Sequence, residues 1–509
     1  MEAWFMLLVS LSIAAILKAF FKILIPTKQQ ILNLPPSPST IPIITDILWL
    51  FKSLTGLESI LKSIIAKLGP IVTLDIGFRR IIFVEDHSIA HQALVRNGAV
   101  FASRPPSLAT TKIVNSNQST INTSLYGPTW RLLRRNLTSQ ILHPTRSRSY
   151  SHARKWVIQI LMDRLLSESQ SGEPVLVKEH FQFAMFCLLV LMCFGDKLSE
   201  KQIKEVEEVQ RRFALNLLRF NVFNIWPSVT KILLRKRWQQ MLSLRRDQEA
   251  VLIPLIEARK KANREGINKV EDEDYVLSYV DTLLDLEIPH ENRKLDEGEM
   301  VSLCNEFLNG GTDTTSTALQ WIMANLVKYP HIQEKLFREI KGVVGEGEVV
   351  VKEDELQRMP YLKAVVLEGL RRHPPGHFVL PHAVTEEVML DQYLIPKNST
   401  VNFMVAQMGW DPKVWEDPMG FKPERFMSSD GEVVFDITGN KEIKMMPFGV
   451  GRRICPGLGL AMLHLEYFVA NLVWNLEWKA KDGDEVDLSE KQELTTVMKT
   501  SLEVHVFPR

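Results

Sequence analysis

The sequence predicts a mainly α-helical fold, with one large helical body, a small β-rich side and an N-terminal transmembrane helix. Helical periodicity recurs over most of the chain and predicts the body, whereas strand patterns are short and scattered. An apolar run near the N-terminus predicts the transmembrane helix. Of the 509 residues, 45% are hydrophobic and 24% are charged, a balance that suffices for a large core and argues against disorder.

The apolar run covers residues 3–25, with Lys18 and Lys22 as its only charges. As a helix it would span about 34 Å, enough for a bilayer core of about 30 Å. A cleaved signal peptide is the alternative, but the run is long and its basic residues follow it, so an uncleaved anchor is favoured. Lysines on its C-terminal flank predict that this flank stays in the cytosol.

Four prolines between residues 35 and 42 then favour stiff, extended backbone. We expect three segments: a membrane anchor over 1–28, a proline-rich hinge over 29–45 and one globular domain over 46–509.

Within the globular domain, helices and strands are predicted by different periodicities. The clearest helical stretches are residues 151–168, 200–220, 240–263, 299–328 and 458–475. Strand signals lie near residues 71–86 and 388–405.

Charge and cysteine content exclude several classes of function. The 61 basic and 60 acidic residues nearly cancel, so no global field would hold the protein on nucleic acid. The four cysteines include no CxxC pair and are too few for a disulfide framework. They suit a reducing compartment and weaken zinc and iron–sulfur interpretations.

One cysteine stands out in the stretch PFGVGRRICPGLG, residues 447–459. The residues that follow have strong helical character, so Cys455 is expected at a helix N-terminus, where free N–H groups and the helix dipole favour a thiolate. A thiolate can hold a metal. An incidental buried cysteine in a glycine-rich turn is the alternative.

The complete motif decides between these interpretations. Residues 448–457 match F-x-x-G-x-R-x-C-x-G and resemble the haem-binding loop of the cytochromes P450. The resemblance implies a cytochrome P450 fold over 46–509, haem b (iron protoporphyrin IX) as cofactor, and Cys455 as the axial iron ligand. It further implies that Phe448 packs beside the sulfur, that Gly457 belongs to the haem-binding loop and that Arg453 pairs with a haem propionate.

A second motif places Glu368 and Arg371 at i and i+3 of a predicted helix. Alone, such a pair is usually a weak surface contact, but its apolar neighbours favour burial. With Arg425 in the later stretch FKPERF, the spacing resembles the buried Glu–Arg–Arg network of the family. The resemblance implies a structural role for these three residues.

A third motif, residues 310–315, matches [AG]-G-x-[DE]-T-[TS] inside a predicted helix. Its glycines each cost about 1 kcal/mol relative to alanine, so a kink or tight helix packing is one explanation. The resemblance implies instead a locally opened turn over the haem, with Thr314 contacting dioxygen and Asp313 relaying protons. This threonine favours monooxygenation over the related haem-thiolate isomerases and dehydratases.

Further matches concern the edge of the haem. Trp130 and Arg134 match W-x-x-x-R, and His382 matches another position, all of which contact propionates in the family. A plain pair on a helix surface is the alternative for the first two.

Substrate and partners follow from the same resemblance. The segments that line family pockets, residues 107–111, 301–308, 377–380 and 494–498, are largely apolar and imply a lipophilic small-molecule substrate. The stretch 213–226 could dip into a membrane or pack in the core.

The chain carries no dinucleotide-binding glycine fingerprint, so NADPH-cytochrome P450 reductase is expected to supply electrons for O2 activation. Four basic residues are candidate docking points for it: Arg131, Arg135, Lys444 and Arg452.

The stretch FASRP and the proline hinge resemble the plant microsomal branch, where such enzymes act in specialised or catabolic metabolism. We expect a single-pass protein of the endoplasmic reticulum membrane with a cytosolic catalytic domain. A membrane-anchored haem sensor without catalysis is the alternative from another class.

Overall fold

The computed structural model describes residues 33–38, 54–76, 79–224, 227–265, 277–289, 291–345, 347–481 and 485–509. The predicted anchor, 1–28, and most of the hinge, 29–45, lie outside the described residues. Within the described part, one helix, α9 (Val177–Phe194), is long and apolar enough to cross a membrane, and 78% of it is buried inside the protein.

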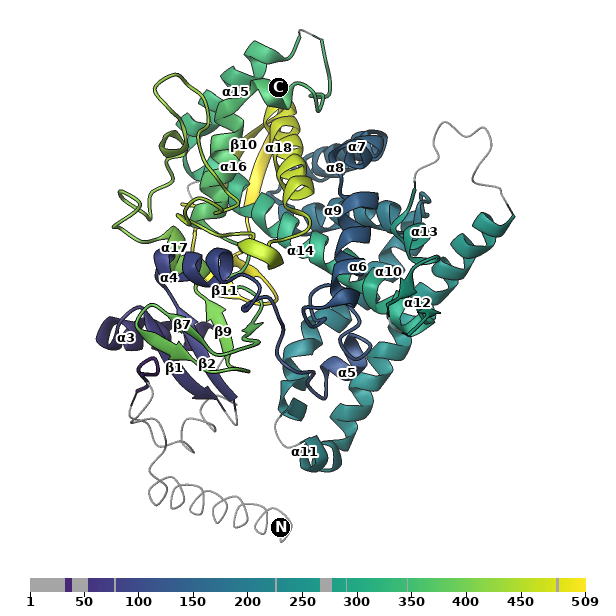
Figure 1. Ribbon diagram of the computed structural model, residues 1–509. Coiled ribbons are helices and arrows are strands. Elements are labelled where there is room, and N and C mark those ends of the chain that lie inside the picture. Colours follow the sequence, from purple (N-terminus) through teal and green to yellow (C-terminus); the bar gives the residue numbers. More distant parts are fainter. Residues whose placement is uncertain are drawn as a thin grey trace, which may run out of the picture.

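A helical body makes up most of the molecule, and α14 (Glu297–Lys328) runs through its centre (Figure 1). Other long helices are α8 (Ser151–Ser169), α10 (Glu200–Asn216), α12 (Arg235–Arg264), α15 (Pro330–Val343), α16 (Pro360–Arg372) and α18 (Leu458–Asn475). Shorter ones are α3 (Leu54–Leu68), α4 (His87–His91), α5 (Thr111–Val114), α6 (Pro128–Asn136), α7 (Pro144–Ser149), α11 (Pro227–Leu233), α13 (Tyr279–Leu283) and α17 (Val405–Gly409). All five predicted helical stretches are confirmed, except that the second changes from α-helix to 3₁₀-helix at Leu217.

The β-rich side lies beside α3 and is built from distant parts of the chain (Figure 1). Its main sheet has the order β1 (Ile71–Ile76), β2 (Arg79–Val84), β9 (Thr400–Phe403), β6 (His382–Ala383). The β2–β9 pair is parallel and joins segments more than three hundred residues apart, whereas the β1–β2 and β6–β9 pairs are antiparallel.

Smaller sheets lie in other parts of the molecule as well. They comprise the hairpins β7 (Val388–Leu390) with β8 (Tyr393–Ile395), β11 (Glu490–Gln492) with β12 (Thr496–Met498), β4 (Glu287–Ile288) with β5 (Arg293–Lys294), and a sheet of β10 (Leu476–Ala480), β13 (Glu503–Pro508) and β3 (Val175–Leu176). β10, for example, packs against α14 and α18 (Figure 1). The strands predicted near 71–86 and 388–405 are confirmed by β1, β2 and β7–β9.

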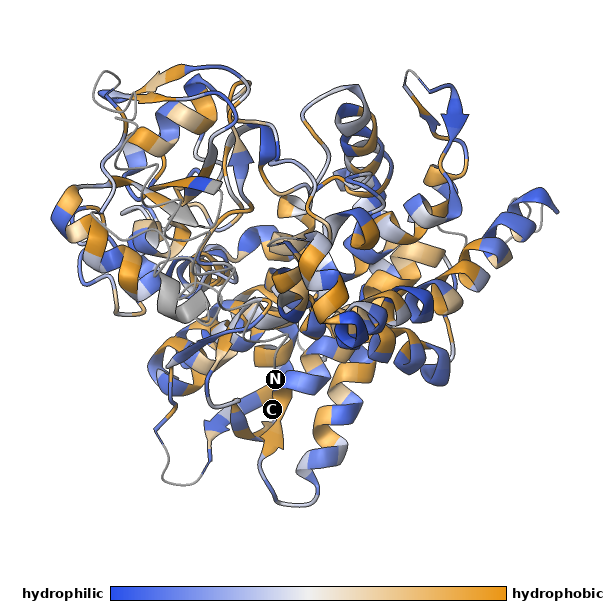
Figure 2. Cartoon of the chain, turned by 90° about the horizontal axis from the view of Figure 1, so that it is seen from below, coloured by the Kyte–Doolittle hydropathy of each residue, from blue (hydrophilic) through white to orange (hydrophobic). Residues whose placement is uncertain are grey.

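The core is built around the contact between α9 and α14. Several outer helices carry hydrophobic residues on one side and hydrophilic residues on the other, as the bands of colour in Figure 2 show, whereas most residues of α9 are buried. Gly311 lets α9 and α14 approach closely, because a Cβ at this position would lie 2.8 Å from Leu189 Cδ1. Tight helix packing, the alternative considered for this motif, is therefore one of its functions.

The aromatic stretch 213–226 packs inward where the structure describes it. Phe213, Phe220 and Phe223 are almost fully buried in a cluster with Met241 and Leu244. Of the two alternatives for this stretch, these three side chains therefore follow core packing and not contact with a membrane.

Candidate active site

A cavity of about 340 Å³ lies between the middle of α14 and the loop that precedes α18. Its lining contains most of the site residues predicted from the sequence: Trp130, Arg134, Thr314, His382, Phe448, Arg453, Cys455 and Gly457. The tertiary fold thus collects residues from α6, α14, β6 and the 447–459 loop around one space. Asp313 is not among the lining residues.

The cysteine loop is held in shape by its own backbone. The Cys455 N–H donates to the carbonyl of Phe448 over 2.8 Å, and α18 begins three residues further on, at Leu458. Gly451 has φ +75°, and a Cβ there would lie 2.0 Å from the Leu94 carbonyl oxygen, so glycine is required at this turn.

The environment of the sulfur differs from the sequence expectation. Burial raises the pKa of the Cys455 thiol, while the Gly457 N–H and the charge of Arg134 oppose this effect. The proximity of a helix N-terminus alone therefore does not make the thiolate the favoured form, because loss of solvation outweighs it. A metal cation at the sulfur would reverse the balance, since a coordinating thiol is deprotonated outright.

The charge of the cavity fits a haem. Arg104, Arg134 and Arg453 all line it, and Glu306 is the one acidic residue among the lining residues. Burial, together with Arg104 and Arg134, lowers the pKa of Arg453 to about 9. In addition, Trp130 Nε1 is buried without a hydrogen-bond partner among the described residues. Surplus positive charge and an unused donor are what a ligand with two carboxylates requires.

Arg453 also holds the surrounding backbone in place. Its Nε, Nη1 and Nη2 donate to the carbonyls of Ala102, Ile121 and Ser124 over 2.6, 3.0 and 2.6 Å. These bonds use three of the five guanidinium N–H groups and leave two for a carboxylate.

His382 is arranged differently from the expected donor to a propionate. Its Nδ1 lies 2.7 Å from the Phe101 carbonyl, so the proton is on Nδ1. Burial and the nearby Arg104 lower the pKa of His382 to about 3, which keeps the ring neutral. The ring therefore presents an acceptor nitrogen, Nε2, and would need a second proton to bond a carboxylate.

On α14, Thr314 and Asp313 face different surroundings. The Thr314 side chain lines the cavity, and its Oγ1 donates to the Gly310 carbonyl over 2.7 Å. Asp313 turns toward α9, where its Oδ1 lies 3.5 Å from Gln182 Nε2, and burial raises the pKa of its carboxyl group. The two residues are neighbours in sequence but are separated by the rotation of the helix.

The locally opened turn expected in this motif is not observed. The helix runs without interruption from Glu297 to Lys328. The hydroxyls of Thr312, Thr314 and Ser316 donate to carbonyls four residues earlier, which adds bonds to the turn and leaves its backbone bonds in place. Space beside the helix comes from Gly310, where a Cβ added to the backbone would meet no atom within 4 Å.

Sequence reasoning missed two charged residues of the cavity, Glu306 and Arg104. The carboxylate of Glu306 accepts the backbone N–H groups of Ile121 and Asn122 over 2.8 and 2.6 Å. Burial raises the pKa of Glu306, and these two donors oppose it. Arg104 Nε donates to the Asn122 carbonyl over 2.8 Å, so both the N–H and the C=O of Asn122 are hydrogen-bonded to charged side chains. Glu306 lies eight residues before Thr314, and this helical spacing was a usable signal.

The structure brings Glu368, Arg371 and Arg425 together behind the cysteine loop. Arg371 Nε and Nη2 lie 2.7 and 2.8 Å from the two carboxylate oxygens of Glu368, and Arg425 Nε lies 3.1 Å from Oε1. Arg371 also donates to the carbonyls of Gly409, Pro418 and Gly420. The side chains of Glu368 and Arg371 are completely buried.

The expected substrate-lining segments contribute unequally. Phe307 from 301–308 and Phe378, Val379 and Leu380 from 377–380 line the cavity, whereas segments 107–111 and 494–498 are not among its lining residues. Of the expected docking residues, Arg452 donates to the Tyr126 hydroxyl over 2.5 Å, and Arg131 lies 5.0 Å from the same ring.

Comparison with known proteins identifies the class. Residues 35–506 match the family model described as Cytochrome P450. With the cysteine loop and the cavity described above, the chain belongs to the cytochrome P450 family and is a monooxygenase with haem as its cofactor.

Particular relatives are plant proteins. The chain is 50% identical over 489 residues to Cytochrome P450 89A9 of Arabidopsis thaliana, which covers 94% of each protein. It is 28% identical over 484 residues to Flavonoid 3'-monooxygenase of the same plant, covering 94% of this chain and 92% of that relative. A zebra fish cytochrome P450 structure with progesterone has a TM-score of 0.72 at 21% identity, over 89% of this chain and 99% of that one. The cytochrome P450 fold predicted for the globular part is thereby confirmed, whereas the predicted N-terminal transmembrane helix lies outside the described residues.

Proposed function

We propose that this monooxygenase inserts one oxygen atom from O2 into a lipophilic small molecule of plant specialised or catabolic metabolism. The observation that carries the proposal is that Cys455 and Thr314 line one cavity whose other walls are largely apolar. A haem bound there supplies a redox-active iron that activates O2.

The residues around the cavity would hold this haem in a single orientation. Cys455 Sγ would be the iron ligand, and Phe448 and Gly457 would delimit the loop that carries it. Arg134, the free N–H groups of Arg453 and the unpaired Nε1 of Trp130 are the donors for the propionates. His382 would join them after gaining a proton.

Thr314 and Asp313 would control protons on the other side of the cavity. The Thr314 hydroxyl donates to the Gly310 carbonyl, so its oxygen is free to accept a hydrogen bond from a group in the cavity. Asp313 faces α9, where the positive charges of Arg211 and Lys178 act to lower its pKa. Because burial raises the pKa of Asp313, its carboxyl group would take up a proton on the α9 side of α14 and release it toward the cavity side of the same helix.

Phe307, Phe378 and Val379 support a lipophilic substrate, since they offer the cavity apolar surface. Relatives named Isoflavone 3'-hydroxylase of Medicago truncatula and Flavonoid 3'-monooxygenase, each 28% identical, agree with the oxidation of small plant compounds.

NADPH-cytochrome P450 reductase is the proposed source of electrons, because the sequence has no nucleotide-binding fingerprint of its own. We place the anchor at 1–28, the hinge at 29–45 and the catalytic domain at 46–509, with a single membrane pass in the endoplasmic reticulum and the catalytic domain in the cytosol. Protease added to intact microsomes should digest the catalytic domain; full protection would contradict this topology.

The decisive experiment is reconstitution of the haem-loaded protein with the reductase, followed by comparison of plant extracts incubated with and without NADPH. A product heavier by one oxygen atom that requires both reductase and NADPH supports the proposal. A product formed without them identifies an isomerase or dehydratase. Haem binding with no product from any extract identifies a sensor.

A further inference from the structure

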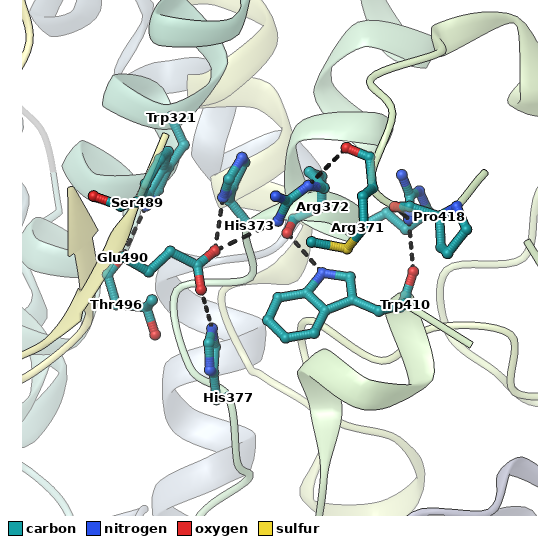
Figure 3. A network of polar contacts seen from close by, with 12 residues as sticks. Trp321, Arg371, Arg372, His373, His377, Trp410, Pro418, Ser489, Glu490 and Thr496 are labelled. Atoms are coloured by element: carbon teal, nitrogen blue, oxygen red, sulfur yellow. Dashed lines mark hydrogen bonds and ion pairs between the residues drawn. The ribbon is translucent and has the colours of Figure 1, made fainter. Parts of the chain in front are cut away.

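Behind the cavity wall lies a buried cluster of charged groups that the proposed reaction does not use. Figure 3 shows Glu490 between His373 and His377, with Arg372 beside them. Glu490 comes from β11, the histidines and Arg372 from the end of α16 and the turn after it, and a fifth member, Glu58, from α3. Ion pairs therefore join three segments that are far apart in sequence.

His377 is held between two carboxylates. Its Nδ1 lies 2.7 Å from Glu58 Oε2, and its Nε2 lies 3.3 Å from Glu490 Oε2. The second contact is an ion pair rather than a well-aligned hydrogen bond. A neutral imidazole has one N–H and would turn a lone pair toward one of the two carboxylates. Two carboxylates on opposite sides of the ring therefore favour the imidazolium.

His373 in the same cluster is neutral. Its Nδ1 lies 2.8 Å from Glu490 Oε1, and its ring stacks on Trp321 with centroids 3.9 Å apart and planes 1° from parallel. Burial lowers the pKa of His373 to about 4. Burial would lower the pKa of His377 as well, but its contacts with Glu490 and Glu58 outweigh this effect and raise it.

The remaining groups that face His377 keep the charges balanced. Lys62 of α3 lies 3.0 Å from Glu58 Oε1, and Gln407 of α17 donates to the same oxygen over 2.8 Å. Arg372 lies 3.6 Å from Glu490 Oε1, and the indole of Trp410 packs edge-on against the His377 ring. His377 is therefore flanked by two carboxylates, with Lys62 and Arg372 further out, and its raised pKa follows from its contacts with Glu490 and Glu58.

The cluster lies directly against the wall of the cavity. His377 is flanked in sequence by Gly376 and Phe378, and both line the cavity. The Thr496 N–H donates to the Pro375 carbonyl over 2.8 Å, and the Val405 N–H donates to the His377 carbonyl over 2.9 Å. Movement of His377 would therefore reach both the wall and the β11–β12 hairpin.

We propose that His377 and Glu490 are positioning residues, and that the His377 imidazolium ties α3 and the β11–β12 hairpin to the 375–380 wall so that the wall keeps the shape that substrate requires. When His377 loses its proton, its ion pair with one of the two carboxylates is lost, and residues 375–380 become more mobile. Because the pKa of His377 is raised in the folded protein, the tie is complete at low pH and disappears as the pH rises through that value.

Hydrogen exchange tests the tie on the full-length haem-loaded protein. Exchange of the Thr496 and Val405 amides is measured from about pH 6 to about pH 9 and normalised to amides of α9. This range extends upward from the ordinary pKa of histidine and leaves Glu58 and Glu490 ionised. We expect wild-type protection at these two amides to fall with rising pH. His377→Gln and Glu490→Gln should lower it at every pH and remove the pH dependence.

Glu493→Gln is the matched control, because Glu493 lies on the same hairpin but pairs with Lys491 and Lys178 outside the cluster. This variant should behave as wild type. Protection that does not depend on pH in the wild type, or that falls equally in Glu493→Gln, overturns the proposal.

A binding measurement tests the effect on the cavity, and this arm rests on the proposed function. The affinities of imidazole and 4-phenylimidazole are read from haem absorbance, because the added phenyl group reaches beyond the iron to the walls. Their ratio should fall severalfold in His377→Gln and stay unchanged in Glu493→Gln; an unchanged ratio in both refutes the positioning role. Failure to bind haem would contradict the proposed function, and the exchange experiment would then be carried out on the haem-free protein with the same expected outcomes.

Discussion

Replacing Glu368 by alanine tests how strongly the buried ion network stabilises the fold. The carboxylate accepts four hydrogen bonds: two from Arg371, one from Arg425 and one from the Lys422 backbone N–H, over 2.7 to 3.1 Å. Without it, two arginine charges remain in a region of low dielectric without their anion.

Removing one partner of a buried pair typically costs about 3–5 kcal/mol. Arg371 keeps its three carbonyl partners, and these partly compensate its charge. We therefore expect a loss near the lower limit, about 3 kcal/mol of unfolding free energy. Because those carbonyls belong to the stretch that leads to the cysteine loop, haem should also be released faster.

Urea unfolding and the rate of haem release measure the two effects. Glu334→Ala is the control, since Glu334 pairs with Arg338 on an exposed face of α15 at a similar distance, 2.9 Å, and should cost well under about 1 kcal/mol. Glu368→Gln keeps the shape but not the charge, and should resemble Glu368→Ala. If Glu368→Ala unfolds no more easily than Glu334→Ala, the buried network does not stabilise the fold as argued.

Three further substitutions test the site. Cys455→Ala should abolish the thiolate-type absorbance of the reduced carbon monoxide complex, and survival of that band would show that the ligand is another residue. Thr314→Ala should keep haem binding but shift NADPH consumption from product to hydrogen peroxide, whereas Thr314→Ser should retain coupling; equal peroxide yields in wild type and both variants would exclude this role. Gly451→Ala should unfold at clearly lower urea concentration than Gly172→Ala. Both glycines have a positive φ, +75° and +77°, a conformation that costs alanine about 1–2 kcal/mol. Of the two positions, only Gly451 has a Cβ clash, with Leu94. Equal losses would mean that the loop relaxes freely.

Much of the architecture could be predicted from neighbouring residues. Helix periodicity located α8, α12, α14 and α18 because a helix repeats its burial pattern every three to four residues, within reach of local inspection. The cysteine loop was recognisable for the same reason: its glycines, Arg453 and Cys455 act within one short turn. The Glu368–Arg371 pair lies on one helical turn, so its closeness was also local information.

Tertiary structure alone decided how these pieces face one another. Three contacts join segments separated by more than 100 residues. They are the parallel pairing of β2 with β9, the hydrogen bonds from the Ile121 and Asn122 N–H groups to Glu306, and the ion pairs of His377 with Glu58 and Glu490. No local pattern encodes such contacts, because they depend on how complete elements pack.

The extent to which each site residue is solvated could not be predicted from the sequence either. A helix N-terminus beside Cys455 predicted a thiolate, but the surrounding chain buries the sulfur and raises its pKa. The glycines before Thr314 predicted an opened turn, but α14, packed against α9, is continuous from Glu297 to Lys328. The amino-acid order by itself determined which groups the site contains and which backbone turns carry them. Their charge states and orientations were decided by the tertiary structure, because burial and long-range pairing change the free energies of charged groups by as much as any local preference does.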